Sequence, residues 1–304
     1  MFNKYTFTIF SIFILINICF CVNYFNFPKK NLVNINSQSN NLVIFNKKNL
    51  VLNNFQDDLI LNNILSNKKI ISISPGGLKG FYLLGVLTYI KQNYNLENYI
   101  FTGASAGSWV SLFMSYKKSN LDLINKIFDD DLMKIKSLKK IQIIIKNRVL
   151  SNFNSDDFDL EKVFIGVSSL NLQKTNTFIY TDFLNLSDAL DCCIASSHIP
   201  LITGGLFNFY KKKLSFDGGF SRYPYLNLST NSYHIHSNIW NVNHYDNNNI
   251  VINIKNKNIF RRIKDVIQLI LPSKKNHLEL YFEGYDNSLN NKIFLDKIFT
   301  PLDK

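Results

Sequence analysis

The pattern of hydrophobic and polar positions changes sharply near residue 69. Before that point, one apolar run occupies 5–22, and an asparagine-rich stretch with short apolar islands follows. From residue 69 onward, short runs with β-branched residues alternate with longer segments whose apolar positions recur every three or four residues. These are the periods of strands and helices. The sequence therefore predicts an N-terminal segment (1–27), an Asn-rich linker (28–68) and an α/β domain (69–304).

The alternation also places the individual elements of that domain. Strands are expected at 69–74, 99–102, 163–169, 177–181, 211–216 and 250–254. Helices are expected at 81–90, 107–116, 187–195, 259–271 and 277–291, with two further helical patterns within 120–148. Alternating strands and helices predict a three-layer α/β/α sandwich with a mainly parallel central sheet.

Three local features refine this outline. The strands at 163–169 and 177–181 are close in sequence, which favours antiparallel neighbours. Ser187 is the expected N-cap of the helix that follows it. The polar, Asn- and His-rich stretch 231–249 is expected to be a surface excursion.

Two glycine-rich turns each join a strand-like run to a helix-like run. The second, over 103–107, reads Gly-Ala-Ser-Ala-Gly and fits the Gly-x-Ser-x-Gly pattern of a nucleophile elbow, with Ser105 at its centre. Gly103 and Gly107 would let the helix turn back on the strand without a collision. The start of a helix also directs backbone N–H groups and partial positive charge at the serine. Ser105 is therefore a candidate nucleophile, expected to be partly exposed.

The first turn, over 75–80, leaves backbone N–H groups bare at the start of a helix. Gly76, Gly77 and Gly80 carry no side chain over these groups, which makes the turn a candidate anion site. The Lys-Ser/Thr pair of a phosphate-binding P-loop is absent from it. Beside a candidate serine nucleophile, an oxyanion hole is the better interpretation.

Together, these motifs resemble those of the patatin-like phospholipases. That family carries a glycine-rich oxyanion motif, then Gly-x-Ser-x-Gly, and much later Asp-Gly-Gly or Asp-Gly-Ala. Here Asp217-Gly218-Gly219 follows, and residues 193–200 resemble the family's Ala-Ser-x-x-x-Pro segment. The resemblance covers about 69–225. One position departs from it: Pro75 replaces the first glycine and has no N–H to donate.

The resemblance implies a lipid acyl hydrolase that needs no metal or cofactor. Ser105 would be the nucleophile and Asp217 its base, without a histidine between them. Gly76, Gly77 and the N–H of Ala106 would form the oxyanion hole. The implied substrates are glycerophospholipids or acylglycerols. Supporting positions in the matching motifs are Lys79, Gly80, Gly103, Gly107, Gly218 and Gly219.

Two alternatives remain open from the sequence. The chain order also permits a Ser-Asp-His α/β-hydrolase esterase, because histidines follow Asp217 at positions 234, 236, 244 and 277. His198 lies in the segment that leads to the site. An inactive, membrane-bound lipid-binding pseudoenzyme is the other alternative, and Pro75 is its main support.

Charge and cysteine usage narrow the possible partners. The chain has 34 Lys and Arg against 22 Asp and Glu, a net charge of +12, but no block of five like charges. A basic surface of this kind fits an anionic membrane better than a nucleic acid. The four cysteines have neither a disulfide nor a metal-binding spacing. His234 and His236 have no obvious third partner for zinc, and the sequence gives no oligomeric state.

The apolar run at 5–22 bears on localisation. Its length suits either a cleaved secretory signal or a membrane anchor. Lysines flank both ends, so the charge distribution does not set an orientation. The expected location is therefore the membrane through this segment, or the secretory pathway if the segment is removed.

Overall fold

The computed structural model describes most of the predicted domain. The described residues are 51–53, 68–135, 137–171, 174–220, 232–235 and 276–302. The N-terminal segment, most of the linker, the expected strand at 250–254 and the expected helix at 259–271 lie outside these ranges and stay predictions.

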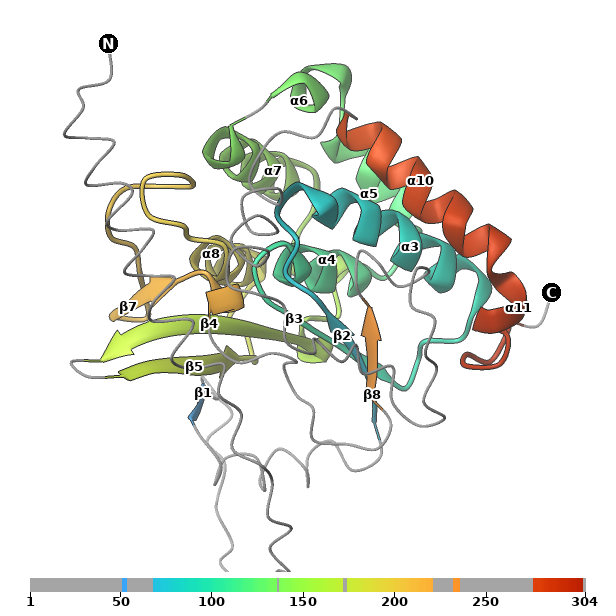
Figure 1. Cartoon of the computed structure of the whole chain (residues 1–304), viewed down its shortest axis with the longest axis horizontal. Helices are drawn as coiled ribbons and strands as arrows, with labels where there is room; N and C mark the ends of the chain where they lie inside the picture. The colour runs from blue at the N-terminus through green and yellow to red at the C-terminus, as the bar shows by residue number, and fades with distance from the viewer. Residues whose placement is uncertain are drawn as a thin grey trace, which may run out of the picture.

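A mostly parallel sheet runs through the centre of the domain, in the order β1-β5-β4-β3-β2-β8 (Figure 1). Its parallel core consists of β2 (Lys69–Ile73), β3 (Tyr99–Gly103), β4 (Val163–Asn171) and β8 (Ser232–Ile235). Antiparallel strands extend it: β5 (Lys174–Tyr180), β1 (Val51–Asn53) and β7 (Lys213–Phe216), which also pairs with β6 (Phe209–Tyr210). The predicted α/β class with a mainly parallel sheet is confirmed.

The helices of the described ranges gather on one side of this sheet in Figure 1. They are α3 (Gly80–Asn93), α4 (Ala106–Met114), α5 (Asn120–Ile127), α6 (Asp130–Lys134), α7 (Leu138–Asn152), α8 (Leu186–Ser196), α10 (His277–Asn290) and α11 (Lys292–Leu295). Short 3-10 turns lie at Gly77–Lys79, Ser155–Asp157, Leu160–Lys162 and Gly218–Phe220. A second helical layer on the opposite face stays a prediction.

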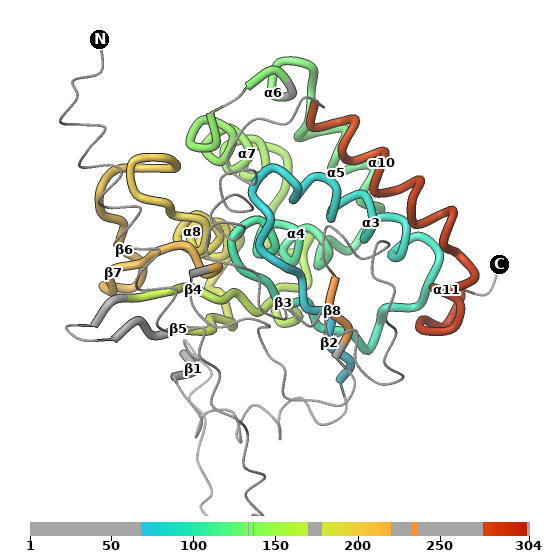
Figure 2. The backbone as a smooth tube through the Cα atoms, viewed as in Figure 1, coloured from blue at the N-terminus to red at the C-terminus, as the bar shows by residue number. Residues whose placement is uncertain are grey.

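Packing follows from which residues are apolar. All five residues of β3 are buried, as expected of a parallel strand in the middle of a sheet. Helix α4 packs on β2, β3 and β4, and α8 packs on β4. Helix α3 is buried along most of its length because α4 contacts it on one side and α10 on another, as the paths in Figure 2 show. The core therefore lies between the sheet and these helices.

Close packing brings the C-terminal part of the chain onto α3. A Cβ atom at Gly85 would lie 1.9 Å from the carbonyl oxygen of Tyr281, and one at Gly284 would lie 2.0 Å from that of Tyr82. The α3 and α10 backbones can approach this closely only because both positions lack a side chain. The predicted helix at 277–291 is confirmed as α10 and is part of the core.

Three details predicted for the strands, helices and surface stretches of the fold are wrong. The strand expected at 211–216 begins at Lys213, because Lys211 and Lys212, with φ of 46° and 65°, form the tight turn between β6 and β7. The α8 cap is Asn185, not Ser187, since the Asn185 side chain accepts the Asp188 N–H at 2.9 Å.

The third correction concerns the stretch expected to be a surface excursion. Residues 232–235 form β8, which pairs in parallel with β2, and His234 and Ile235 are buried. The strand is too short to show a clear period in the sequence. Its position depends on β2, which provides the partner for its backbone groups.

Candidate active site

Ser105 occupies a sharp turn between β3 and α4. Its φ of 54° and ψ of −127° are unfavourable for a residue with a side chain. Two hydrogen bonds hold this conformation: the Ser105 N–H donates to the carbonyl oxygen of Ser196 at 3.2 Å and to its Oγ at 2.9 Å. Ser196 Oγ in turn donates to the carbonyl oxygen of Gly166 at 2.6 Å, which ties the turn to β4.

The glycines around Ser105 allow backbones to approach closely. A Cβ atom at Gly107 would lie 2.3 Å from the carbonyl oxygen of Ile73 in β2, and one at Gly103 would lie 2.3 Å from that of Gly107. Neither backbone oxygen can move without disrupting the sheet or the helix. The start of α4 is therefore fixed against the ends of β2 and β3, and Ser105 is fixed with it.

Asp217 meets this turn from the end of β7. The Ser105 hydroxyl donates to Asp217 Oδ2 at 2.6 Å, across 112 residues of sequence. The other carboxylate oxygen, Oδ1, accepts the Gly219 N–H at 2.7 Å. The backbone of Asp217 is also held, since its N–H donates to the carbonyl of His198 at 2.8 Å and its carbonyl accepts from Ser168 Oγ at 2.9 Å. The carboxylate can therefore take only a narrow range of positions.

The two glycines after Asp217 lie where the motif needs them. A Cβ atom at Gly218 would lie 2.2 Å from the carbonyl oxygen of Gly166, so the turn fits closely against β4. A Cβ atom at Gly219 would lie 2.9 Å from Asp217 Oδ1 and 3.1 Å from the Cβ of Pro75. Pro75 thus borders the Asp217 turn.

Burial changes the acidity of Asp217. The carboxyl is almost fully buried, and desolvation raises its pKa from 3.8 to about 6, although hydrogen bonds from Ser105 and Gly219 act in the opposite direction. At neutral pH the group is still mostly ionised, but it is a stronger base than an exposed aspartate. A carboxylate in this state can accept a proton from a hydroxyl that contacts it.

The prediction that Ser105 is partly exposed is wrong. Only 6% of the residue is exposed, because its hydroxyl points toward Asp217 inside a pocket and not toward open solvent. The backbone turn does project the side chain from the end of the sheet, as an elbow should. Helices α3 and α7 then cover the space in front of it.

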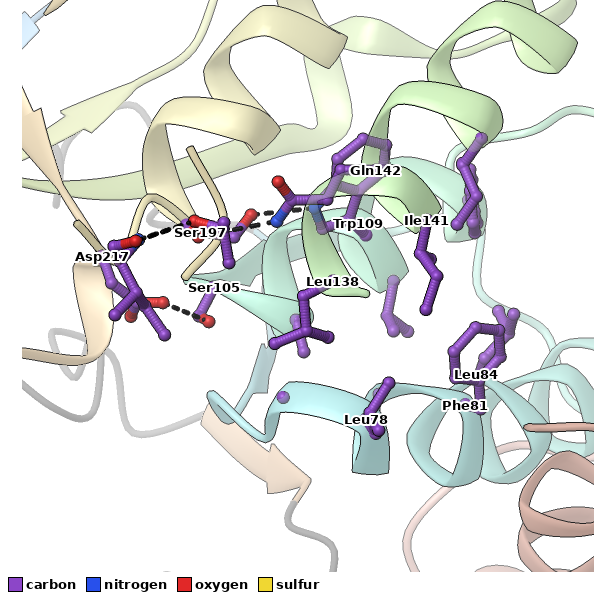
Figure 3. Close-up of a pocket in the computed structure, with 18 of the residues that line it drawn as sticks. Leu78, Phe81, Leu84, Ser105, Trp109, Leu138, Ile141, Gln142, Ser197 and Asp217 are labelled. Atoms are coloured by element: carbon purple, nitrogen blue, oxygen red, sulfur yellow. Dashed lines mark hydrogen bonds between the residues drawn. The ribbon is translucent and has the colours of Figure 1, made fainter. Parts of the chain in front are cut away.

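That pocket has about 660 Å³ of empty space, part of it open to solvent. Figure 3 shows Ser105 and Asp217 at one end, with Leu78, Phe81 and Leu84 of the α3 region at the other. Most of the remaining wall is apolar and comes from α4 and α7: Trp109, Val110, Phe113, Leu138, Ile141 and Ile145. A pocket of this kind offers an apolar chain a place to bind next to a reactive polar end.

Gly77 and Ala106 are the candidate oxyanion donors that share the pocket with Ser105. Both line the pocket, and among the described residues the backbone N–H of neither donates to a backbone carbonyl. Gly77 has a φ of 53°, a conformation that glycine adopts without strain. Gly76 and Lys79 belong to the same turn but are not among the described residues of the pocket wall.

Gly80 completes the contact between the two glycine-rich turns. It lines the pocket, and a Cβ atom there would lie 2.9 Å from the Cβ of Ala106. The start of α3 therefore rests directly against the start of α4. The two turns predicted from the sequence are brought together, and the first of them faces the Ser105 hydroxyl.

The described histidines do not share the hydrogen bond between Ser105 and Asp217. His277 stacks on Phe81 with ring centroids 4.5 Å apart. His198 is buried, its Nε2 has no hydrogen-bond partner in the structure, and desolvation lowers its pKa. His234 lies on β8, and burial lowers its pKa to about 4. Each of these rings is a neutral, buried side chain at neutral pH.

Sequence reasoning missed three residues that build the site. Ser196 fixes the Ser105 turn, Trp109 Nε1 donates to Ser197 Oγ at 2.9 Å, and Gln142 contacts the Ser197 carbonyl at 3.5 Å. All three act on or within the segment 193–200, whose resemblance to a family motif does not by itself reveal a role. That resemblance was the one sign in the sequence that this segment belongs to the site.

Two kinds of feature are absent from the described ranges. No group of three or more His, Cys, Asp or Glu is placed there to hold a metal ion, and His236 lies outside those ranges. Across the same residues, no helix combines the length and the apolar character needed to cross a bilayer. The apolar run at 5–22 is not among these residues.

A family model described as patatin-like phospholipase matches residues 71–226, just over half of the chain. The chain belongs to the patatin-like phospholipase family. The match includes both glycine-rich turns, the 193–200 segment and Asp217, which confirms the resemblance found from the motifs. Patatin-like phospholipases are in general lipid hydrolases, so membership supports lipid acyl hydrolase activity. A comparison with curated proteins gave no match.

Proposed function

We propose that this chain hydrolyses carboxylic esters of glycerolipids, with Ser105 as nucleophile and Asp217 as its base. One observation carries the proposal: the Ser105 hydroxyl donates to the buried Asp217 carboxylate at 2.6 Å, at the polar end of an apolar pocket. A nucleophile in direct contact with its base, next to a place for an acyl chain, is the arrangement that ester hydrolysis requires.

The first half of the reaction forms an acyl-serine. Ser105 Oγ attacks the ester carbonyl carbon while Asp217 Oδ2 accepts the hydroxyl proton. The resulting tetrahedral intermediate collapses, the bond to the alcohol oxygen breaks, and Asp217 returns the proton to the leaving alcohol or lysolipid. The acyl group then stays on Ser105 as an ester.

The second half repeats these steps with water. A water molecule gives its proton to Asp217 and attacks the acyl carbon, and the bond to Ser105 Oγ breaks. Ser105 regains the proton and the fatty acid leaves. In both halves the N–H groups of Gly77 and Ala106 are the best-placed donors for the oxyanion. One such donor typically contributes about 3–4 kcal/mol.

The apolar wall supports a fatty acyl chain as the group that enters the pocket. Desolvating such a chain stabilises binding by about 0.8 kcal/mol for each buried CH₂. Short, soluble esters are expected to react as well, but with lower kcat/KM, because they leave most of the wall uncovered. The substrate class proposed is therefore a glycerophospholipid or an acylglycerol in a membrane.

The inactive-pseudoenzyme alternative receives little support from the site. Pro75 cannot donate an N–H, but Gly77 and Ala106 supply two donors without it. Pro75 packs instead near Gly219, which donates to the Asp217 carboxylate. The proline is thus compatible with an intact oxyanion hole.

The proposal also extends to location. We propose that residues 1–27 anchor the chain to a membrane or, if cleaved, direct it to the secretory pathway. The 18 residues of the run at 5–22 are the support for this. Comparing the mass and membrane association of the native chain with those of a variant lacking 1–27 distinguishes the two.

A direct test is to incubate the purified full chain with a mixed lipid extract and identify products by mass. Release of fatty acid and lysolipid by the wild type, and none by Ser105→Ala of equal thermal stability, is the expected result. Equal product from both proteins would contradict the proposal.

A further inference from the structure

The α8–β7 loop, defined here as residues 197–212 and including the short strand β6, exposes large apolar side chains beside the pocket. Its exposed fractions are 54% for Leu201, 41% for Leu206, 62% for Phe207 and 66% for Phe209. In Figure 1 this loop, drawn in gold, stands out from the body of the protein beside α8. Four such side chains within nine residues form a patch of the kind that marks an interaction site.

The loop keeps these side chains exposed in a defined conformation. Thr203 Oγ1 accepts the Ile199 N–H at 2.7 Å and donates to the Ser197 carbonyl at 2.9 Å. The Leu201 N–H donates to the Gly205 carbonyl at 3.2 Å, and Leu201 has a φ of 66°, which is unfavourable for leucine. An exposed leucine at this position gains no burial within the protein that would offset the strain.

The same loop borders the candidate active-site pocket. Ile199 and Thr203 line the pocket from the loop, and Leu138 lines it from the first turn of α7. The next two residues of α7, Lys139 and Lys140, are exposed. The apolar patch and these lysines are therefore direct neighbours, in sequence, of residues that line the same pocket.

The charge of the two flanking segments has a single sign. No Asp or Glu occurs in 132–155, which contains five lysines and one arginine, or in 192–216, which contains three lysines. Helix α10 is the contrast: it carries Glu279, Glu283 and Asp286 and no Lys or Arg, although it too exposes apolar residues, Phe282 and Leu289. Two of these lysines pair with aspartates of α8, Lys146 with Asp191 at 2.5 Å and Lys211 with Asp188 at 3.4 Å, whereas the exposed Lys139 and Lys140 form no ion pair among the described residues. Exposed apolar side chains next to such lysines suit an anionic bilayer.

We propose that Leu201, Leu206, Phe207 and Phe209, together with Lys139 and Lys140, dock the pocket mouth onto anionic lipid bilayers. These six residues are termed the docking surface. The apolar side chains enter the headgroup boundary while the lysines contact lipid phosphates. Lipid then reaches Ser105 without crossing water. The delivery of lipid to Ser105 rests on the proposed lipid hydrolase function, whereas the contact between the docking surface and the bilayer does not.

The test reports contact at single positions in the full chain, so that anchoring by residues 1–27 does not obscure it. Cys19 and Cys21 are replaced by serine, and the buried Cys192 and Cys193 are left in place. A polarity-sensitive fluorophore is attached through Phe207→Cys or, as matched control, Phe282→Cys on α10. Each labelled protein is mixed with one of two kinds of vesicle. The first contains phosphatidylcholine alone; in the second, about one lipid in three is phosphatidylserine, which makes the surface anionic.

The expected result is a blue shift at position 207 with anionic vesicles, a smaller one with neutral vesicles, and none at position 282. Lys139→Gln with Lys140→Gln should raise the lipid concentration for half-maximal shift by about tenfold at low salt, and high salt should have a similar effect. Equal shifts at 207 and 282, or no shift at 207, would overturn the docking surface. A blue shift at position 207 that appears without lipid as the protein concentration rises would also overturn the proposal, because it would show that a second copy of the chain covers this surface.

Hydrolysis of a soluble short-chain ester by the same proteins separates this inference from the proposed function. Phe207→Ser with Phe209→Ser should keep that activity and lose about tenfold or more on vesicles. A shift at 207 in a chain with no esterase activity would sink the hydrolase proposal and leave the docking surface standing. Undiminished hydrolysis of vesicle lipid by the Phe207→Ser, Phe209→Ser variant would contradict the docking surface and leave the hydrolase proposal intact.

Discussion

The two ends of the pocket are held by different forces. At the polar end, Ser105 and Asp217 are fixed by hydrogen bonds to the backbone and by glycines whose neighbours are backbone oxygens. At the apolar end, α3 and α7 line the pocket with side chains such as Phe81 and Ile141, which are held by dispersion forces and by burial. A change of one atom should therefore have a large effect at the polar end and a graded one at the apolar end.

The largest effect is expected from Asp217→Asn. Asparagine keeps the shape of the side chain but cannot accept the Ser105 proton, so kcat for a short-chain ester should fall by about 10³-fold or more. The matched controls are single replacements of His198, His234 and His277 by glutamine. Each should retain activity within about tenfold. A histidine variant as inactive as Asp217→Asn would favour the Ser-Asp-His alternative.

The same variant should be more stable than the wild type at neutral pH. Since the folded pKa of Asp217 is about 6 and the ordinary value is 3.8, the folded state binds the proton more tightly than the unfolded state. The contribution of Asp217 to stability is therefore present at low pH and falls as pH rises from about 4 to about 6. Two pKa units correspond to about 3 kcal/mol.

Denaturant unfolding at pH 4 and pH 8 measures this difference. The free energy of unfolding of Asp217→Asn minus that of the wild type should rise from pH 4 to pH 8, by up to about 3 kcal/mol. Activity of the wild type should change in the opposite direction and decline about tenfold for each pH unit below 6, because the base must be ionised. If the difference in unfolding free energy between the two proteins does not change with pH, the Asp217 carboxylate is solvated in the folded state.

A smaller, graded effect is expected at the apolar end. Leu138→Ala shortens the pocket wall on α7 and should lower kcat/KM for long-chain esters about fivefold to tenfold, while short-chain esters are unaffected. Leu278→Ala on α10 is the matched control, since Leu278 is also partly buried but does not line the pocket. Equal losses for long and short esters would show that Leu138 acts on the fold and not on the acyl chain.

The two ends also differ in how much of their structure could be predicted from the sequence. The polar end depends on local motifs, and the turns around Ser105 and Asp217 could be found because glycines at fixed spacings mark positions where a side chain would collide with the backbone. Strands β2, β3 and β4 and helix α3 were predicted because their apolar runs are continuous in the sequence. The helix expected at 259–271 and the N-terminal segment lie outside the described residues and stay predictions.

Other features depend on distant parts of the chain and left little trace in the sequence. The burial of Ser105 arises from α3 and α7, which lie on either side of it in sequence. Ser196 acts on Ser105 across 91 residues, through a hydrogen bond that no periodicity indicates. Strand β8 needs β2 beside it before four residues form a strand. Such long-range partners override local propensity.

The central claim, that Ser105 is a nucleophile activated by Asp217, is tested most directly by its reaction with a fluorophosphonate probe. Intact mass and peptide mapping should show one adduct per chain, on the peptide that contains Ser105. Labelling should be absent in Ser105→Ala and slowed by about 10³-fold in Asp217→Asn. An adduct on any other residue, or unchanged labelling of the Ser105→Ala chain, would contradict the account.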